Sequence, residues 1–373
     1  MMAQAYTPGL TVAESITIRK ERRLPLAGQV KVLVGDLVAA EQVVAETALP
    51  GNVTTINVAH DLNVNAEEVP RLMLKAQGDP VQAREPIAEH KALWGIFHAV
   101  SRSPIEGTVE NISPVTGQVL IRGPAVPVEL TAYIDGTVVE VLNDEGVVVE
   151  CQGALIQGII GIGGEAHGEI MIAVEHPAQP LTADLIAEDC RGKLIVGGEQ
   201  ATLDALQQAR EVGAVGVVVG GIDAAVLDEL LGETLGVAIT GDEDVGITLI
   251  ITEGFGKLPM AQRTFDLLRS HAGEHASLNG ATQIRAGVIR PEVIIPHPAT
   301  TEAPPEPAIM ELRVGSTVRL IRDPYFGLLG TITALPEELQ KIETESLVRV
   351  AHVRTEEGKE LTVPRANIEL IQQ

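Results

Sequence analysis

Aromatic residues are scarce in this 373-residue chain, which has one Trp, three Tyr and four Phe. It therefore lacks the aromatic platforms on which many proteins stack single-stranded nucleic acid. Positive charge is scarce too, because 27 Lys and Arg stand against 51 Asp and Glu and leave a net charge of −24. This acidity argues against a general nucleic-acid coat, which needs a basic surface. Hydrophobic residues, at 45%, are plentiful enough to exclude an intrinsically disordered chain.

Cysteine and long apolar runs are also scarce. Cys151 and Cys190 cannot form a disulfide framework or a four-cysteine zinc site, and their apolar surroundings favour buried thiols. No stretch reaches the roughly 18 uninterrupted apolar residues of a membrane-spanning helix. The start of the chain has no apolar core behind a basic segment, so a secretory signal is not expected. These absences predict a soluble, cytoplasmic protein that does not contact a membrane.

The length suffices for two or three domains, and an internal repeat marks the first of them. Short Val- and Ile-rich runs separated by turn dipeptides predict strands up to about residue 175. Within them, Gly35–Glu46 aligns without gaps with Gly78–Glu89, and both contain the pattern G-D-x-V-x-A. A second pattern, I-[DE]-G-T-V, starts at Ile105 and again at Ile134. Repeats this short cannot each bury a core, so we expect the copies to pair face to face.

These turn motifs resemble the barrel-sandwich hybrid over roughly residues 15–125. That fold belongs to lipoyl and biotinyl carrier domains, to inserts in the large subunits of bacterial RNA polymerase and to peripheral subunits of quinone oxidoreductases. The resemblance implies a prosthetic group on a hairpin lysine, for which Lys91 is the candidate. However, no Met flanks Lys91 and its spacing to Pro104 is long, which favours an ordinary loop lysine. Trp94 is interpreted as a core anchor rather than a ligand platform.

The pattern changes near residue 180 to alternating strands and helices, which predicts a small α/β domain with a largely parallel sheet. It resembles the swivelling or protease-associated type of α/β domain, whose members bind or reposition other groups. We expect strands at 193–196, 215–219, 235–239 and 247–251, helices at 201–210, 224–231 and 260–271, and a closing strand at 281–289.

In such a sheet, ligands approach the carboxyl ends of the strands, near helix amino termini. Candidate ligand-binding residues at these ends are Gly197, Gly198, Gly220, Gly221, Thr240 and Gly241. Their backbone amides suit an anion, but acidic residues line the same rim and oppose phosphate. Helix caps and solvated turns are therefore the favoured interpretation.

Motifs for catalysis are missing. Gly161–Gly164 lacks the G-K-[ST] ending of a phosphate loop, and His271 and His275 are separated by a glycine that interrupts a helical zinc site. There is no G-x-S-x-G and no cysteine nucleophile paired with a histidine. We therefore predict no catalytic residues, no metal and no cofactor, although an acid–base pair assembled by folding stays open.

The C-terminal part follows a Pro- and Thr-rich linker and carries the most specific motif of the chain. Residues 311–371, with Asp323-Pro324-Tyr325-Phe326-Gly327 at a turn between two strands, resemble the KOW motif of transcription elongation and ribosomal proteins. The resemblance implies a small SH3-like barrel whose turn touches RNA or a protein. The residues it assigns to a partner are Arg319, Arg322, Tyr325, Phe326 and Gly327. Acidic residues slightly outnumber basic ones here, which makes a protein partner at least as plausible as RNA.

Together these patterns predict a mainly β protein with an α/β insert domain. The expected parts are a β-rich domain with barrel-sandwich hybrid repeats at 1–178, a small parallel α/β domain at 179–295, a linker at 296–309 and a KOW barrel at 310–373. The leading functional hypothesis is a non-catalytic scaffold or adaptor that contacts a protein through its KOW module. The alternatives are a transcription- or ribosome-associated RNA- or DNA-binding factor, and a prosthetic-group carrier or enzyme subunit.

Overall fold

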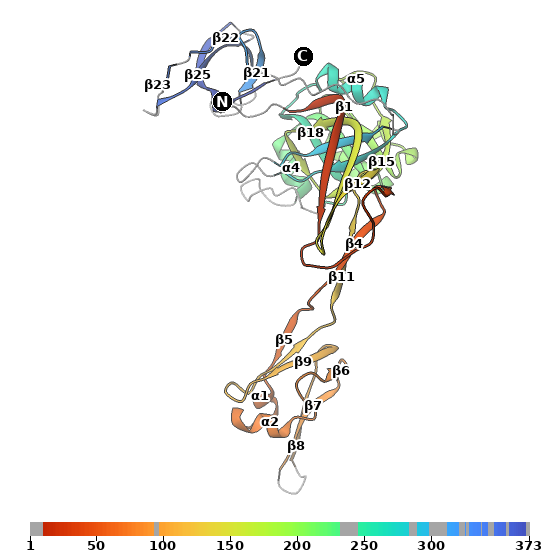
Figure 1. Ribbon diagram of the computed structural model, residues 1–373, viewed down its shortest axis with the longest axis vertical. Helices are drawn as coiled ribbons and strands as arrows, with labels where there is room; N and C mark the ends of the chain where they lie inside the picture. The colour runs from red at the N-terminus through yellow and green to blue at the C-terminus, as the bar shows by residue number, and fades with distance from the viewer. Residues whose placement is uncertain are drawn as a thin grey trace.

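The computed structural model confirms that the protein is mainly β, with 48% of residues in strands and 16% in helices. It describes residues 10–92, 97–231, 245–282, 289–297, 312–320, 325, 328–336, 338–341, 347–355 and 358–370. A central body carries a small lobe at the end of a narrow ribbon of strands, and a separate β unit lies near the C-terminus (Figure 1).

The body is built on one large sheet. Its strand order is β14-β18-β17-β16-β15-β19-β20-β13-β12-β3, with β1 also pairing with β13. The strands are β1 (Val12–Arg23), β3 (Leu37–Val38), β12 (Gly136–Leu142), β13 (Gly146–Gln157), β14 (Ile160–Ile162), β15 (Glu165–Ile172), β16 (Lys193–Val196), β17 (Gly216–Ile222), β18 (Thr248–Phe255), β19 (His275–Asn279) and β20 (Glu292–Pro296).

Strands β15 to β18 run parallel, as the alternating pattern predicts, and the other pairings are antiparallel. Helices α3 (Leu203–Val212) and α4 (Ala224–Leu231) pack on one face of the sheet, and α5 (Gln262–Ser270) packs on the other. The predicted strand 235–239 lies outside the described residues, as does most of 281–289. The same sheet also contains β13 and β15, so it continues across residue 178, where the sequence pattern changes.

The lobe is inserted into the body's N-terminal strands. Strands β4 (Val43–Leu49) and β11 (Val126–Thr131) pair antiparallel as the connecting ribbon, together with β2 (Gln29–Val30). The lobe has a four-stranded sheet in the order β5 (Val53–Ile56), β10 (Val119–Arg122), β9 (Gly107–Ile112) and β6 (Pro80–Val81). It also has helices α1 (Val58–Leu62) and α2 (Val69–Leu72) and a hairpin of β7 (Pro86–Ala92) and β8 (Phe97–Arg102). A core of its own includes Val81, Ile87, Val109 and Ile121.

Both G-D segments form the same turn. Gly35 and Gly78 have φ angles of +95° and +92°, which an L side chain rarely adopts. In each turn the aspartate side chain accepts a hydrogen bond from the backbone three residues earlier, at 2.8 Å for Asp36 and 2.7 Å for Asp79. This closure of the turn by an aspartate side chain is the local reason why the motif recurs.

The G-D segments do not pair with each other, which corrects the expectation of face-to-face copies. The first segment pairs with the I-D-G-T-V segment, through Val38 opposite Gly136, and the second pairs with I-E-G-T-V, through Val81 opposite Gly107. The two pairs contribute to separate cores, so each short repeat obtains its core from the complementary motif.

The duplication extends to two whole units. Strands β1, β13, β12 and β3 are adjacent in the same order as β5, β10, β9 and β6. The hairpins match in register as well: Val43 opposite Thr131 in β4–β11 corresponds to Pro86 opposite Arg102 in β7–β8, with a bulge following in both. We call these the proximal unit (β1, β3, β12, β13 and hairpin β4–β11) and the distal unit (β5, β6, β9, β10 and hairpin β7–β8). The distal unit is thus inserted at the hairpin end of the proximal unit.

The C-terminal part forms a five-stranded sheet in the order β26 (Glu360–Pro364), β25 (Val350–Thr355), β22 (Leu329–Ala334), β21 (Thr317–Leu320) and β27 (Ile368–Leu370). Between β22 and β25 in the chain, two short strands pair with each other: β23 (Gln340–Lys341) and β24 (Leu347–Val348). The core of the five-stranded sheet includes Val318, Ile332, Val353 and Ile368. Val318 and Ile332, on the neighbouring strands β21 and β22, are both fully buried in this core.

Candidate functional site

Two of the five predicted partner-binding residues, Arg319 and Tyr325, are described, whereas Arg322, Phe326 and Gly327 lie outside the described residues. The Arg319 side chain is buried, at 7% exposure, and its guanidinium forms an ion pair with Glu253 of β18. Tyr325 is half-buried, and the Lys359 ammonium lies 5.5 Å from the centroid of its ring. Arg319 therefore holds the C-terminal sheet against the body and is not part of an exposed basic edge in this arrangement.

The glycines at the ends of β16 and β17 are closely packed by backbone. A Cβ on Gly198 would lie 2.4 Å from the Gln179 carbonyl oxygen, and one on Gly221 would lie 2.1 Å from that of Gly256. The amides of Gly197, Gly220 and Gly221 donate to the carbonyls of Val218, Gly198 and Glu199. Close chain packing accounts for glycine here, and these amides are already occupied. Ligand binding at the strand ends stays a prediction, and Thr240 and Gly241 lie outside the described residues.

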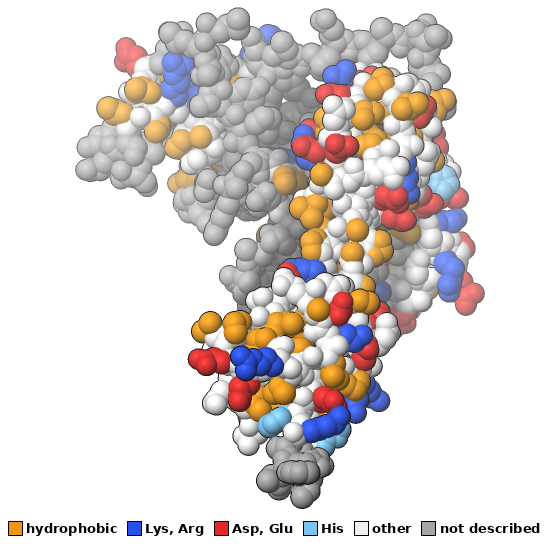
Figure 2. Space-filling view, turned by 60° about the horizontal axis from the view of Figure 1, so that its bottom comes forward, with side chains coloured by type: hydrophobic (Ala, Val, Ile, Leu, Met, Phe, Trp, Pro, Cys, Tyr) orange, Lys and Arg blue, Asp and Glu red, His pale blue; other side chains and the backbone are white. Residues whose placement is uncertain are grey.

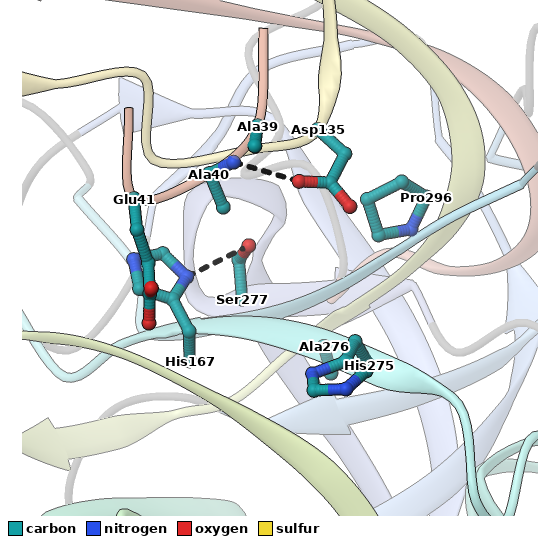
Figure 3. A pocket seen from close by; sticks show the side chains of 9 residues that line it. All are labelled: Ala39, Ala40, Glu41, Asp135, His167, His275, Ala276, Ser277 and Pro296. Atoms are coloured by element: carbon teal, nitrogen blue, oxygen red, sulfur yellow. Dashed lines mark hydrogen bonds between the residues drawn. The ribbon is translucent and has the colours of Figure 1, made fainter. Parts of the chain in front are cut away.

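A pocket of about 200 Å³ lies between the proximal unit and the polar face of β15 and β19 (Figure 3). The segment that follows the first G-D turn forms one wall, and the sheet forms the opposite wall. The lining residues are Ala39, Ala40, Glu41, Asp135, His167, His275, Ala276, Ser277 and Pro296. Asp135 accepts a 2.6 Å hydrogen bond from the Ala40 amide, which ties the turn to the start of β12. The pocket therefore combines two carboxylates, two imidazoles and a hydroxyl.

His167 and Ser277 face each other in this pocket because β15 and β19 pair with these two residues in register. The His167 Nδ1 lies 3.2 Å from the Ser277 Oγ. Burial lowers the pKa of His167, and the nearby carboxylates of Glu41, Glu165 and Asp135 only partly oppose this effect. The imidazole is therefore neutral at pH 7, and its Nδ1 can either accept a hydrogen bond from the Ser277 hydroxyl or donate one to it, depending on the tautomer. Sequence reasoning missed this pair because its members are far apart in the chain and belong to no motif.

A polar network beside the pocket, buried at Glu292 and Tyr133 and exposed at Glu165, joins the proximal unit to the rest of the sheet. Glu292 on β20 is 7% exposed, forms an ion pair with Lys20 on β1 and accepts a 3.2 Å hydrogen bond from the Tyr133 hydroxyl. Arg22 binds both carboxylate oxygens of Glu165, at 2.5 and 2.7 Å, and lies 5.2 Å from the centroid of the Tyr133 ring. Burial, followed by the Glu292 charge, raises the pKa of Tyr133 well above its usual value. These contacts fix the geometry of the pocket wall.

The candidate carrier lysine, Lys91, lies on β7 near the end of the distal hairpin. Its side chain is 57% exposed, and its Nζ lies 2.8 Å from Glu89. His98 on β8 contacts the same carboxylate at 3.2 Å. Hydrogen bonds from Lys91 and His98 lower the pKa of Glu89. Trp94, interpreted from the sequence as a core anchor, lies outside the described residues.

Among the residues that the structure describes, no three His, Cys, Asp or Glu side chains are grouped so as to hold a metal ion. In the same residues, no helix has the length and apolar character needed to cross a membrane.

Cys151 and Cys190 are both buried, as expected, and burial raises the pKa of Cys151 to about 12. The sequence matches no family model and no curated protein.

Proposed function

We propose that this protein is a non-catalytic scaffold or adaptor that holds a protein partner. The observation that carries the proposal is the nested duplication, in which a unit with its own core is held away from the body by the β4–β11 ribbon (Figure 1). A projecting unit of this kind offers surface to partners. The polar pocket beside β15 fits this function as part of the joint between the proximal unit and the sheet.

The proposal includes a finer description of the folds. The proximal and distal units are barrel-sandwich hybrids, supported by the shared turns, strand order and hairpin register of the two copies. The C-terminal sheet is an SH3-like barrel of the KOW type, supported by its five antiparallel strands and its apolar core. In this description the partner binds around Tyr325, next to the Arg319–Glu253 contact that positions the barrel.

The test is affinity purification of the full chain from its native host, with and without nuclease. Tyr325→Ala is the test variant, and His352→Ala, which removes another half-buried side chain of the C-terminal sheet on β25, is its matched control. We expect one stoichiometric protein that survives nuclease, is lost with Tyr325→Ala and is kept with His352→Ala. A partner that disappears with nuclease would support the nucleic-acid alternative. Absence of any stoichiometric partner would reject the adaptor.

A second candidate function is a prosthetic-group carrier, which the position of Lys91 favours. The lysine is exposed near the end of the hairpin in the unit that resembles a carrier domain. Intact mass of the protein isolated from its native host tests this candidate. An added mass that disappears in Lys91→Arg would support it, whereas an unmodified mass would reject it.

A further inference from the structure

The two nested units form the same turn with different surfaces. In the proximal unit the turn exposes three large apolar side chains, with Leu33 at 73%, Val34 at 62% and Leu37 at 77%. Because the turn is closed by the Asp36 side chain and by Gly35, these side chains are held on a fixed backbone. Contiguous exposed apolar groups of this kind mark interaction sites more often than isolated ones do.

The distal unit provides an internal control for this surface. At the equivalent positions it has Ala76, Gln77 and Pro80, and its turn keeps the same aspartate closure and the same backbone hydrogen bond to the facing strand. The facing bonds are Gly35 N to Val138 O and Gly78 N to Val109 O, both 2.8 Å. The turn therefore does not require apolar residues, and their presence in the proximal copy calls for a separate reason.

We propose that the proximal turn, Leu33 to Leu37, docks a short extended segment of a partner protein that carries apolar side chains flanked by Lys or Arg. This inference rests on the proposed adaptor function and assigns it a second contact, away from the C-terminal sheet. Leu37 belongs to β3, the last strand in the order of the large sheet. An extended segment placed there continues the sheet, which is a common mode of peptide recognition.

The chemistry of the occupant follows from charge and size. Asp36 lies within the turn, and the exposed Glu140 follows on β12, whose Val138 is bonded to the turn. The distal unit has Asn111 at the position equivalent to Glu140. Lys31, two residues before the turn, is paired with Glu46, so Asp36 and Glu140 leave this surface with net negative charge. Figure 2 shows the body behind the distal unit coloured by side-chain type. Basic residues next to an apolar centre complement this surface.

A second copy of the chain does not fit the surface well. Three side chains expose far less than the roughly 800 Å² that each partner buries in a stable dimer. The net charge of −24 on each copy also opposes self-association. A short segment needs only a small apolar contact and gains from the negative charge.

The experiment selects displayed random short peptides on the full chain and measures their affinities for matched variants. Leu33→Ala/Val34→Gln gives two of the three proximal positions the distal residues and keeps Leu37 in β3, and Ala76→Leu/Gln77→Val makes the reciprocal change. We expect the selected peptides to be apolar with flanking Lys or Arg, and to bind the first variant at least about tenfold more weakly. We expect the reciprocal variant to gain a second site. Thermal unfolding checks that both variants fold, which the shared turn geometry predicts.

Three results would overturn the inference. The first is a set of selected peptides that bind the proximal and distal turns equally, and the second is a set of selected peptides that are acidic. The third is that sedimentation finds the wild-type protein as a dimer and Leu33→Ala/Val34→Gln as a monomer. The last result assigns the surface to a second copy. Because this experiment does not use the C-terminal sheet or a native partner, its failure leaves the adaptor test with Tyr325→Ala unaffected. If peptides bind the proximal turn as expected but affinity purification finds no partner, the docking surface is supported and the adaptor function is rejected.

Discussion

The ion pair between Lys20 and Glu292 should contribute measurably to the stability of the body. The Glu292 carboxylate is buried, with 10% of its side chain exposed, whereas the Lys20 side chain is 25% exposed. Lys20→Met keeps the apolar stem and removes the charge, which leaves the buried carboxylate without its ammonium partner, while the Tyr133 hydroxyl still donates to it. Breaking a fully buried pair costs about 3–5 kcal/mol. Because water reaches Lys20, we expect a loss of about 2–3 kcal/mol.

The neighbouring pair on the same strand is the control. Arg19 and Glu150 also form an ion pair, but the Arg19 side chain is 69% exposed, so Arg19→Met should cost about 0.5 kcal/mol or less. Hydrogen exchange of β13 and β20 is the assay, because a chain with several units does not unfold as two states. In the double variant Lys20→Met/Glu292→Gln, the losses should be clearly less than additive. Equal effects of Lys20→Met and Arg19→Met, or additive losses in the double variant, would refute the reasoning.

Three further predictions follow from the same contacts. Asp36→Ala and Asp79→Ala each lose one turn-closing hydrogen bond, so each should destabilise only its own unit, by about 1 kcal/mol in hydrogen exchange; equal loosening of both units by either change would contradict separate cores. Because the pKa of His167 is lowered in the folded protein, the unfolded chain takes up a proton on this histidine first as the pH falls. The contribution of the neutral, buried His167 to folding stability is therefore present above about pH 6.5 and is lost as the pH falls below that value. His167→Gln should therefore reduce the acid sensitivity of the β15–β19 region in pH-dependent unfolding, and an unchanged profile would disprove the link. Glu253→Gln removes the charge of one carboxylate that Arg319 contacts, so the radius of gyration measured by X-ray scattering should increase; an unchanged radius would show that this ion pair does not hold the barrel.

Local signals in the sequence were sufficient to predict where several helices and turns begin and end. The helix at Leu203–Val212 begins after Thr202, whose side chain caps the Ala205 amide, and ends at Gly213 with φ +81°. The G-D turns are equally local, because the glycine and aspartate that form them are adjacent. Helix caps and turns involve groups a few residues apart, so their signals are readable without tertiary contacts.

The pairing of the repeats was not readable in this way. Both G-D segments have equivalent local chemistry, and each could pair with either I-[DE]-G-T-V segment. The structure pairs the two segments that are nearer to each other in the chain, the second G-D segment and I-E-G-T-V, and it pairs the two that are farther apart, the first G-D segment and I-D-G-T-V. The nearer pair closes the shorter loop and loses less conformational entropy, which is a physical reason for this choice.

The amino-acid sequence by itself determined that the chain is mainly β, where its turns and most of its parallel α/β elements lie, and that its two motifs are duplicated. Only the tertiary structure decided that the duplicated motifs build two nested units, that His167 meets Ser277, and that Arg319 is buried against Glu253. The physical reason is range. Backbone conformation and hydrophobic patterning act over a few residues, whereas these contacts depend on strand register and on packing between segments that are distant in the chain.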